Sequence, residues 1–262
     1  MYEIQTYLGA DGLMHCTVCK EPVEAFYPKG SLLEMRKHHR QCACERKAYA
    51  EEAQYYKEKE HRELIARNKK ICFEEKEMEG VTFQNVERDS GVIRIAEEYV
   101  TNWQKMKENH MGYLFWGPVG TGKSYLAACI ANALLEKEVT VKMTNFNTIL
   151  NDLFAAEDKT EYLRSLNGYE LLIIDDLGVE RSSEYALENI FSVIDWRYRS
   201  GKPLIITTNL PLAQLKQETK IEKKRIYDRI LERCIPVKID GVSRREAMAN
   251  DNMQTMKNIL KI

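Results

Sequence analysis

The chain has 262 residues, enough for one large domain or two unequal ones. Hydrophobic residues make up 44% and charged residues 30%, a balance that supplies a packed core and a well-solvated surface. The formal net charge of −1 excludes a global basic field, although a local basic face would suffice for nucleic-acid binding.

The sequence contains neither a membrane span nor an export signal. No apolar run approaches the roughly 20 residues that cross a bilayer, and no basic segment followed by an apolar one opens the chain. We therefore expect a cytoplasmic protein that makes no membrane contact. In a reducing cytoplasm, clustered cysteines favour metal binding over disulfides.

Two close pairs of cysteines lie in residues 1–44, Cys16 with Cys19 and Cys42 with Cys44. Two such pairs can surround Zn²⁺ tetrahedrally, with Zn–S distances of about 2.3 Å. This segment has few large apolar side chains, so it needs a metal to fold. We predict a zinc-binding N-terminal domain with these four ligands, the alternative being unrelated free cysteines. Three nearby histidines could replace one ligand: His15, His38 and His39.

Residues 45–79 contain no Gly or Pro and are rich in Glu, Lys, Arg and Ala. This composition favours helix, and Glu–Lys neighbours four residues apart would support it. Apolar residues are sparse, which predicts an exposed helical linker, or a solvated linker whose only functional content is its length. Cys72 is interpreted as an incidental residue of this linker, whereas Cys129 and Cys234 are expected to be buried small hydrophobes.

Residues 80–262 show alternating strand and helix signals, which predict an α/β ATPase domain with a parallel sheet flanked by helices. The apolar strand Tyr113–Trp116 precedes a Gly-rich loop, and the helix Ser124–Leu135 follows it. The loop fits the pattern G-x-x-x-x-G-K-[ST] at every specified position, with the residues Gly117, Pro118, Val119, Gly120, Thr121, Gly122, Lys123 and Ser124.

These residue types suit a triphosphate. Glycines let the backbone turn its N–H groups toward phosphate oxygens, and the helix that follows directs its positive end to the same anion. Lys123 would contact the β- and γ-phosphates, and the Ser124 hydroxyl would bind Mg²⁺. The loop therefore predicts an ATP and magnesium site.

A second motif follows the predicted strand Val139–Met143. Leu171–Ile174 is a run of β-favouring apolar residues that ends in Asp175 and Asp176, the form of a Walker B strand. The carboxyl end of such a strand delivers its carboxylates to the ligand crevice of the sheet. Asp175 would hold Mg²⁺ together with Ser124, and Asp176 would orient or deprotonate the attacking water.

Two further elements complete the predicted sheet. Ser183–Arg199 places apolar residues on one helical face, with Gly201 as a stop, and Leu204–Thr208 has the pattern of a buried strand. Continuous apolar strands that alternate with helices imply a parallel sheet covered on both faces.

Residues 81–249 resemble the DnaC/IstB branch of the AAA+ ATPases. The matching segments are GPVGTGKSYLAACIANAL, LLIIDDLG, WRYRSGKPLIITTNL, RIYDRILERC and GVSRRE. The resemblance implies an AAA+ fold and ATP hydrolysis. Many AAA+ ATPases have Glu where this chain has Asp176, which is one methylene shorter, so slower hydrolysis or a longer water bridge is expected.

The resemblance also implies roles by position. Asn209 matches the polar sensor-1 residue, Arg229 the arginine finger offered to a neighbouring subunit's ATP, and Arg245 the sensor-2 residue that binds the nucleotide in cis. A guanidinium at the transferred phosphoryl group can contribute about 10³–10⁵ in rate. A finger supplied in trans implies an ATP-dependent homo-oligomer. The alternative is a solvated basic helix, since other arginines lie nearby, namely Arg225, Arg233 and Arg244.

A zinc-bearing module, a linker and an AAA+ module in this order resemble replicative helicase loaders of the DnaC/DnaI type. The resemblance implies that the N-terminal domain grips the replicative helicase, that the ATPase domain binds single-stranded DNA, and that hydrolysis releases the loader. A basic run could contact DNA or form a solvated helix face: Lys216, Lys220, Lys223, Lys224 and Arg225.

Two other functions compete with this interpretation. One is an IstB-type transposition helper that binds duplex DNA, which the paired cysteines argue against. The other is a non-catalytic adaptor whose ATP site only switches its shape, an alternative that Asp176 leaves open.

Overall fold

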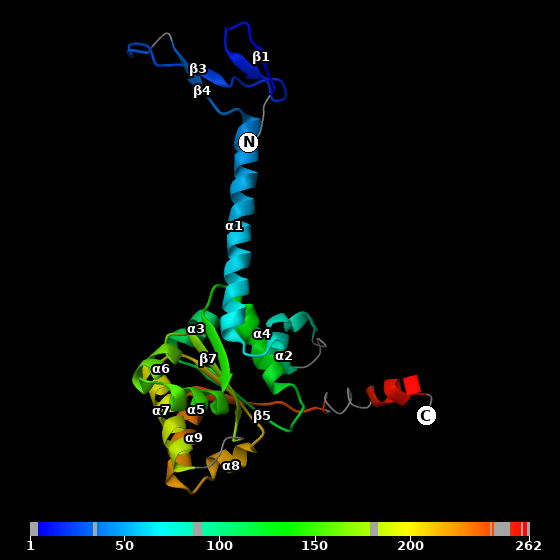
Figure 1. Ribbon diagram of the computed structural model, residues 1–262, viewed down its shortest axis with the longest axis vertical. Helices are drawn as coiled ribbons and strands as arrows, with labels where there is room; N and C mark the ends of the chain where they lie inside the picture. The colour runs from blue at the N-terminus through cyan, green and yellow to red at the C-terminus, as the bar shows by residue number, and fades with distance from the viewer. Residues whose placement is uncertain are drawn as a thin grey trace. The chain divides into compact units, whose positions relative to one another are not determined.

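The computed structural model of the protein describes residues 5–33, 36–85, 91–178, 183–241, 243, 252–257 and 259–260. The chain forms two compact units, Met1–Leu64 and Ile65–Ile262 (Figure 1). Within the described ranges, every helix is too short or too polar to span a membrane.

The first unit consists of two small hairpins and the start of a long helix. β1 (Thr6–Leu8) pairs with β2 (Met14–Cys16), and β3 (Glu24–Phe26) pairs with β4 (Lys37–His39), both antiparallel. α1 (Ala43–Cys72) follows them. The buried apolar cluster of this unit comprises Cys16, Val23 and Cys42. Such a core buries too little apolar surface to hold a fold by itself.

α1 confirms the helix expected from the composition of residues 45–79, although it begins and ends earlier than that range. One side of its last turns is buried. Ile65, Cys72 and the following Phe73 are buried, and the latter two join the main core of the second unit. Burial raises the pKa of the Cys72 thiol to about 12. The interpretation of Cys72 as an incidental linker residue is therefore wrong: it is a small hydrophobe of the core.

The second unit is built on a five-stranded sheet in the order β6-β7-β8-β5-β9, with every neighbouring pair parallel. The strands are β5 (Gly112–Trp116), β6 (Val141–Asn145), β7 (Leu171–Leu177), β8 (Leu204–Thr208) and β9 (Cys234–Lys238). The expected strands are confirmed, with β6 two residues further along the chain. β9 was not expected, and as an edge strand it tolerates a proline.

Helices cover both faces of this sheet (Figure 1). One face carries α2 (Gly91–Thr101), α3 (Trp103–Glu108) and α4 (Lys123–Leu135). The other carries α5 (Phe146–Ala155), α6 (Lys159–Leu166), α7 (Glu184–Ser200), α8 (Leu212–Lys216) and α9 (Ile221–Arg233). Successive residues of β7 alternate between the two cores, so the strand is buried on both sides. This arrangement confirms the predicted α/β fold.

α7 has the ends that its sequence predicts. The Ser183 hydroxyl accepts a hydrogen bond from the N–H of Ala186 at 3.2 Å, and Gly201 closes the helix with a φ of 66°. Between these caps, Arg197 is only 1% exposed. Its guanidinium donates to the backbone carbonyls of Tyr169, Glu170 and Pro203 at 2.6 to 3.1 Å.

The strand order places three carboxyl ends side by side. β8 lies between β5 and β7, although β7 precedes it and β5 comes much earlier in the chain. Residues that follow β5, β7 and β8 therefore meet at one edge of the sheet. The Gly-rich phosphate-binding loop, residues 117–124 and called the P-loop from here on, follows β5. Two carboxylates lie near the end of β7, and Asn209 follows β8.

Candidate functional site

The loop between β5 and α4 has a backbone that only glycine can adopt at three positions. Gly117, Gly120 and Gly122 have φ values of 147°, 81° and 92°. A Cβ on Gly117 would lie 2.2 Å from the carbonyl oxygen of Ile239, and one on Gly120 would lie 2.2 Å from the Ser243 hydroxyl. The glycines thus serve both the turn and the close approach of the chain after β9.

Lys123 is held inside this loop. It is 5% exposed, and its ammonium donates to the carbonyl oxygens of Gly117 at 3.1 Å and Pro118 at 2.7 Å. α4 begins at Lys123 with Gly122 as its N-cap, so no side chain caps the first N–H groups of the helix. A buried ammonium beside uncapped helical amides is the arrangement that binds a phosphate.

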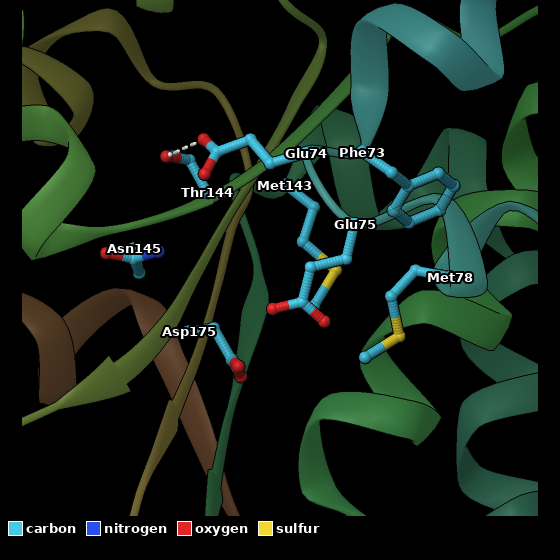
Figure 2. Close-up of a pocket in the computed structure, with 8 residues that line it drawn as sticks. All are labelled: Phe73, Glu74, Glu75, Met78, Met143, Thr144, Asn145 and Asp175. Atoms are coloured by element: carbon cyan, nitrogen blue, oxygen red, sulfur yellow. Dashed lines mark hydrogen bonds between the residues drawn. The ribbon is translucent and has the colours of Figure 1, made fainter.

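Asp175, near the end of β7, lies within reach of the P-loop helix. Its carboxylate accepts hydrogen bonds from the hydroxyls of Ser124 and Thr207, the latter at 2.5 Å. Burial raises the pKa of Asp175, and both hydroxyls oppose this shift by stabilising the carboxylate. The side chain also lines a pocket of about 50 Å³ (Figure 2). Ser124 and Asp175 together offer oxygen donors of the kind that Mg²⁺ prefers.

Asp176 occupies a break in the sheet. Its φ is 55°, and the pairing of β7 with β8 shifts register between Ile174 and Leu177. A bulge of this kind redirects a side chain and often marks a site. Asn209 Nδ2 donates to the Asp176 carboxylate at 3.4 Å, so the two side chains expected to handle the water are neighbours.

Thr207 is a residue of this site that sequence reasoning missed. It is fully buried, its hydroxyl donates to the Asp175 carboxylate, and the same oxygen accepts the Asp176 N–H at 2.9 Å. One hydroxyl therefore helps to fix the positions of both Asp175 and Asp176. The only signal in the sequence is that Thr207 lies two residues before Asn209 on a strand whose other residues are apolar or Thr.

Arg229 lies on α9, facing α7. Its guanidinium forms an ion pair with Asp195 at 2.7 Å and lies over the rings of Phe191 and Tyr198, at 4.5 and 5.8 Å from their centroids. Arg225 lies over Phe191 as well, at 4.2 Å. The structure thus holds Arg229 in contacts within its own chain, and its role toward a second subunit stays a prediction.

The remaining expected residues are Arg245 and the basic run. Arg245 lies outside the described residues. The predicted basic run begins at the end of α8 and continues into α9. Lys220, the N-cap of α9, is exposed, as are Lys224 and Arg225 within the helix. Exposure permits contact with DNA but is also what a solvated helix face shows.

The four paired cysteines of the first unit converge. The sulfurs of Cys16, Cys19, Cys42 and Cys44 all lie within 4.8 Å of one another. Cys16 and Cys42 are fully buried, and the other two are partly exposed. This donor set fits a tetrahedral zinc ion.

Local hydrogen bonds prepare the cluster for a cation. The backbone N–H of Glu21 donates to the Cys19 sulfur and lowers the pKa of that thiol to about 6. Burial, together with the neighbouring sulfurs, raises the pKa of Cys44 to about 12. Four thiolates this close repel one another, so full deprotonation of the set requires a cation between them.

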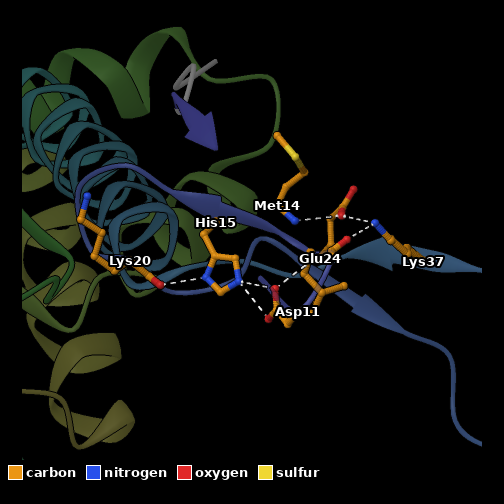
Figure 3. A network of polar contacts seen from close by, with 8 residues as sticks. Asp11, Met14, His15, Lys20, Glu24 and Lys37 are labelled. Carbon is orange, nitrogen blue, oxygen red and sulfur yellow. Dashed lines mark hydrogen bonds and ion pairs between the residues drawn. The ribbon is translucent and has the colours of Figure 1, made fainter. Parts of the chain in front are cut away.

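Two nearby histidines have other partners. His15 uses Nδ1 for the carbonyl of Lys20 and Nε2 for the Asp11 carboxylate, both at 3.0 Å (Figure 3). His39 Nε2 lies 3.2 Å from Glu45, which in turn accepts the N–H of Cys42. These histidines support the cysteine-bearing turns, and the geometry favours the all-cysteine ligand set.

The strand order, the P-loop after β5 and the carboxylates near the end of β7 define an AAA+ ATP-binding protein. Comparison with known families agrees. The model of the family described as "IstB-like ATP binding protein" matches residues 49–251, and the chain belongs to that family. The resemblance to the DnaC/IstB branch is thereby confirmed.

Curated relatives include two named loaders. The chain is 29% identical over 140 residues to "Replicative helicase loader DnaC" of Escherichia coli strain K12, a match that covers 52% of this chain and 55% of that protein. It is 24% identical over 192 residues to "Replicative helicase loader DnaI" of Bacillus subtilis strain 168, covering 67% and 62%. The match therefore spans less than two thirds of either relative.

Solved structures agree on the fold. A crystal structure of DnaI superposes with a TM-score of 0.58 at 25% identity, covering 68% of this chain and 99% of that one. A crystal structure of the DnaC helicase loader gives a TM-score of 0.53 at 22% identity, covering 63% and 100%. The second likeness, at this identity, speaks for the fold alone.

Proposed function

We propose that this protein is a cytoplasmic helicase loader that binds and hydrolyses ATP while it places a replicative helicase on single-stranded DNA. The observation that carries the proposal is the meeting of Lys123, Ser124 and Asp175 in a chain whose named relatives are helicase loaders. Because the match spans only part of those relatives, the activity and partners are proposed for this chain.

The P-loop would hold the triphosphate. Lys123 would exchange its loop carbonyl partners for the β- and γ-phosphate oxygens. Ser124 and Asp175 would hold Mg²⁺, which supplies positive charge to the phosphoryl group as its bonds change. Asp175 must be deprotonated for this role, and its two hydroxyl donors favour the carboxylate form.

Asp176 and Asn209 would handle the attacking water. Asp176 would accept its proton, and Asn209 would keep the water and the carboxylate in line. Arg229 would reach the γ-phosphate of a neighbouring subunit, and Arg245 would act on the nucleotide in cis. Because the arginine would act on a neighbour's ATP, hydrolysis would depend on assembly of a homo-oligomer. Arg229 would first have to leave its ion pair with Asp195.

The cysteine cluster would bind Zn²⁺ and thereby fold the first unit, which would serve as the surface that grips the helicase. The ATPase unit would bind the single strand through phosphate contacts that weaken with added salt.

Co-purification with the replicative helicase of the same host tests the proposal. We expect the full-length protein to retain the helicase, in amounts that depend on ATP. Lys123→Ala should lose that dependence and reduce ATP hydrolysis by about 100-fold or more, because no charge then meets the phosphates. Lys105→Ala, an exposed lysine of α3, is the matched control.

A Cys16→Ser, Cys19→Ser double variant distinguishes the proposed role of the first unit from that of the second. It should lose zinc and the helicase while it still binds ATP. Retention of one equivalent of zinc and of the helicase would refute the assignment of the cluster. Failure of the unmodified protein to bind the helicase with or without ATP would refute the loader.

The family description favours one alternative, a transposition helper of the IstB type. That function predicts tighter binding to duplex than to single-stranded DNA and stimulation of a transposase. A filter-binding competition between the two DNA forms distinguishes the candidates.

A further inference from the structure

The segment that follows α1, residues 73–78, is anchored to the sheet at its start. Phe73 is buried in the main core. The Glu74 carboxylate accepts hydrogen bonds from the hydroxyls of Thr144 at 2.8 Å and Thr148 at 3.0 Å, at the end of β6 and the start of α5. Two hydroxyl donors on one carboxylate restrain the position of Glu74, and therefore also the position of the next residue in the chain.

The same segment is anchored to the P-loop helix at its end. The carbonyl oxygen of Met78 accepts a hydrogen bond from Nδ2 of Asn132, a buried residue of α4, at 2.8 Å. Between these anchors, Glu75 occupies the N-cap position of the short 3₁₀ helix η1 (Lys76–Gly80) without a side-chain capping bond, and its carbonyl accepts the N–H of Met78 at 3.0 Å. The backbone at Glu75 is therefore restrained by contacts on either side of it along the chain.

The Glu75 side chain extends into the pocket that Asp175 lines. Both residues belong to the wall of this 50 Å³ cavity, and the Glu75 carboxylate points toward the Asp175 side of it (Figure 2). The two negative charges repel each other across the pocket. A divalent cation at Asp175 reverses the sign of that interaction, because it attracts both carboxylates.

We propose that Glu75 is a second, outer carboxylate of the magnesium site, supplied by the segment after α1 and lining the same pocket as Asp175. The inference rests on the proposed ATP site. It adds a residue outside both Walker motifs, and it ties the carboxyl end of α1 to the metal through one side chain. Glu75 is exposed, so solvent screens its charge and the effect lies at the lower end of what outer carboxylates contribute.

A magnesium titration of nucleotide binding tests this role without turnover. The full-length protein is mixed with a fluorescent, non-hydrolysable ATP analogue, and binding is followed as Mg²⁺ is raised from zero. For Glu75→Gln we expect the half-saturating Mg²⁺ concentration to rise about 10-fold, the lower end of outer-carboxylate effects. Nucleotide binding in EDTA should be unchanged or stronger, because one repelling charge is gone. Glu75→Asp, which keeps the charge, should fall between the two.

Glu77→Gln is the matched control, because it removes the same charge two residues away, within η1, and Glu77 does not line the pocket. Its magnesium dependence should equal that of the unmodified protein. Equal magnesium dependence of Glu75→Gln and the unmodified protein would overturn the role of Glu75 while leaving the ATP site intact. Absence of nucleotide binding by the unmodified protein at millimolar Mg²⁺ would overturn the ATP site and this inference together.

Discussion

The two acidic residues that follow the apolar part of β7 are both hydrogen-bonded to one side chain from another strand, through the carboxylate of Asp175 and the backbone N–H of Asp176. The Thr207 hydroxyl uses its hydrogen for Asp175 and its lone pair for the Asp176 N–H. This buried contact fixes the rotamer of Asp175 and the turn at Asp176, whose φ of 55° is costly for a non-glycine residue. Loss of such a supporting contact typically lowers metal affinity or activity by about 10- to 100-fold.

Replacing Thr207 with valine should therefore disturb hydrolysis while preserving the shape of the core. We expect Thr207→Val to lower the rate of phosphate release by about 10-fold and to raise the Mg²⁺ requirement, because Asp175 loses a donor and Asp176 an acceptor. Thr207→Ser keeps the hydroxyl and should retain most of the activity. Equal rates for the valine and serine variants would show that the hydroxyl is not used.

At the scale of elements, α7 is tied to two strands by one buried arginine. Arg197 donates to carbonyl oxygens at Tyr169 and Glu170, just before β7, and at Pro203, just before β8. Burial lowers the pKa of Arg197 to about 9, so the charged form is costly there and its hydrogen bonds must offset that cost. These contacts lie at the amino ends of the strands, and they help to set the register of the carboxyl ends that carry the site.

Arg197→Met should destabilise the second unit by about 3 kcal/mol, because it leaves buried carbonyls without donors. Denaturant unfolding followed by tryptophan fluorescence measures this, since all three tryptophans lie in residues 65–262. Arg164→Met, at an exposed position of α6, should leave the midpoint unchanged. If both variants unfold at the same denaturant concentration, the buried arginine does not tie these elements together.

At the scale of the whole molecule, the two units differ in what holds them. The second has two extensive apolar cores on either side of its sheet. In the described part of the first, the buried apolar cluster consists of Val23 and two cysteines of the four-cysteine cluster. Apolar burial therefore accounts for the fold of the second unit, and we expect the first to rely on the proposed bonds between a metal and the four sulfurs.

Removal of zinc by a chelator should accordingly unfold the first unit alone. We expect residues 5–42 to become sensitive to protease while the P-loop unit keeps its protection and still binds ATP. Acidification should act in the same direction, because protons compete with the metal for the four sulfurs. Limited proteolysis with mass spectrometry, alongside measurement of zinc content, checks both points. Full protection of the first unit after complete loss of zinc would contradict this account.

The local motifs were predictable because the residues that give each motif its chemistry are close together in the sequence. The P-loop needs glycine at fixed spacing, and the Walker B strand is recognised by an apolar run before two carboxylates. Two cysteine pairs imply a four-sulfur cluster. The capped helix α7 and four of the five sheet strands follow from periodicity in the same way.

The sequence by itself thus determined that the chain carries a phosphate loop, a carboxylate-bearing strand and paired cysteines. Only the tertiary structure decided which distant residues are in contact. It shows that Thr207 bonds the Asp175 carboxylate and the Asp176 N–H, that Arg229 pairs with Asp195, and that Cys72 is buried. Strand order and helix packing join residues that are far apart along the chain. Periodicity and spacing describe only neighbours, so these contacts become visible once β8 stands between β5 and β7.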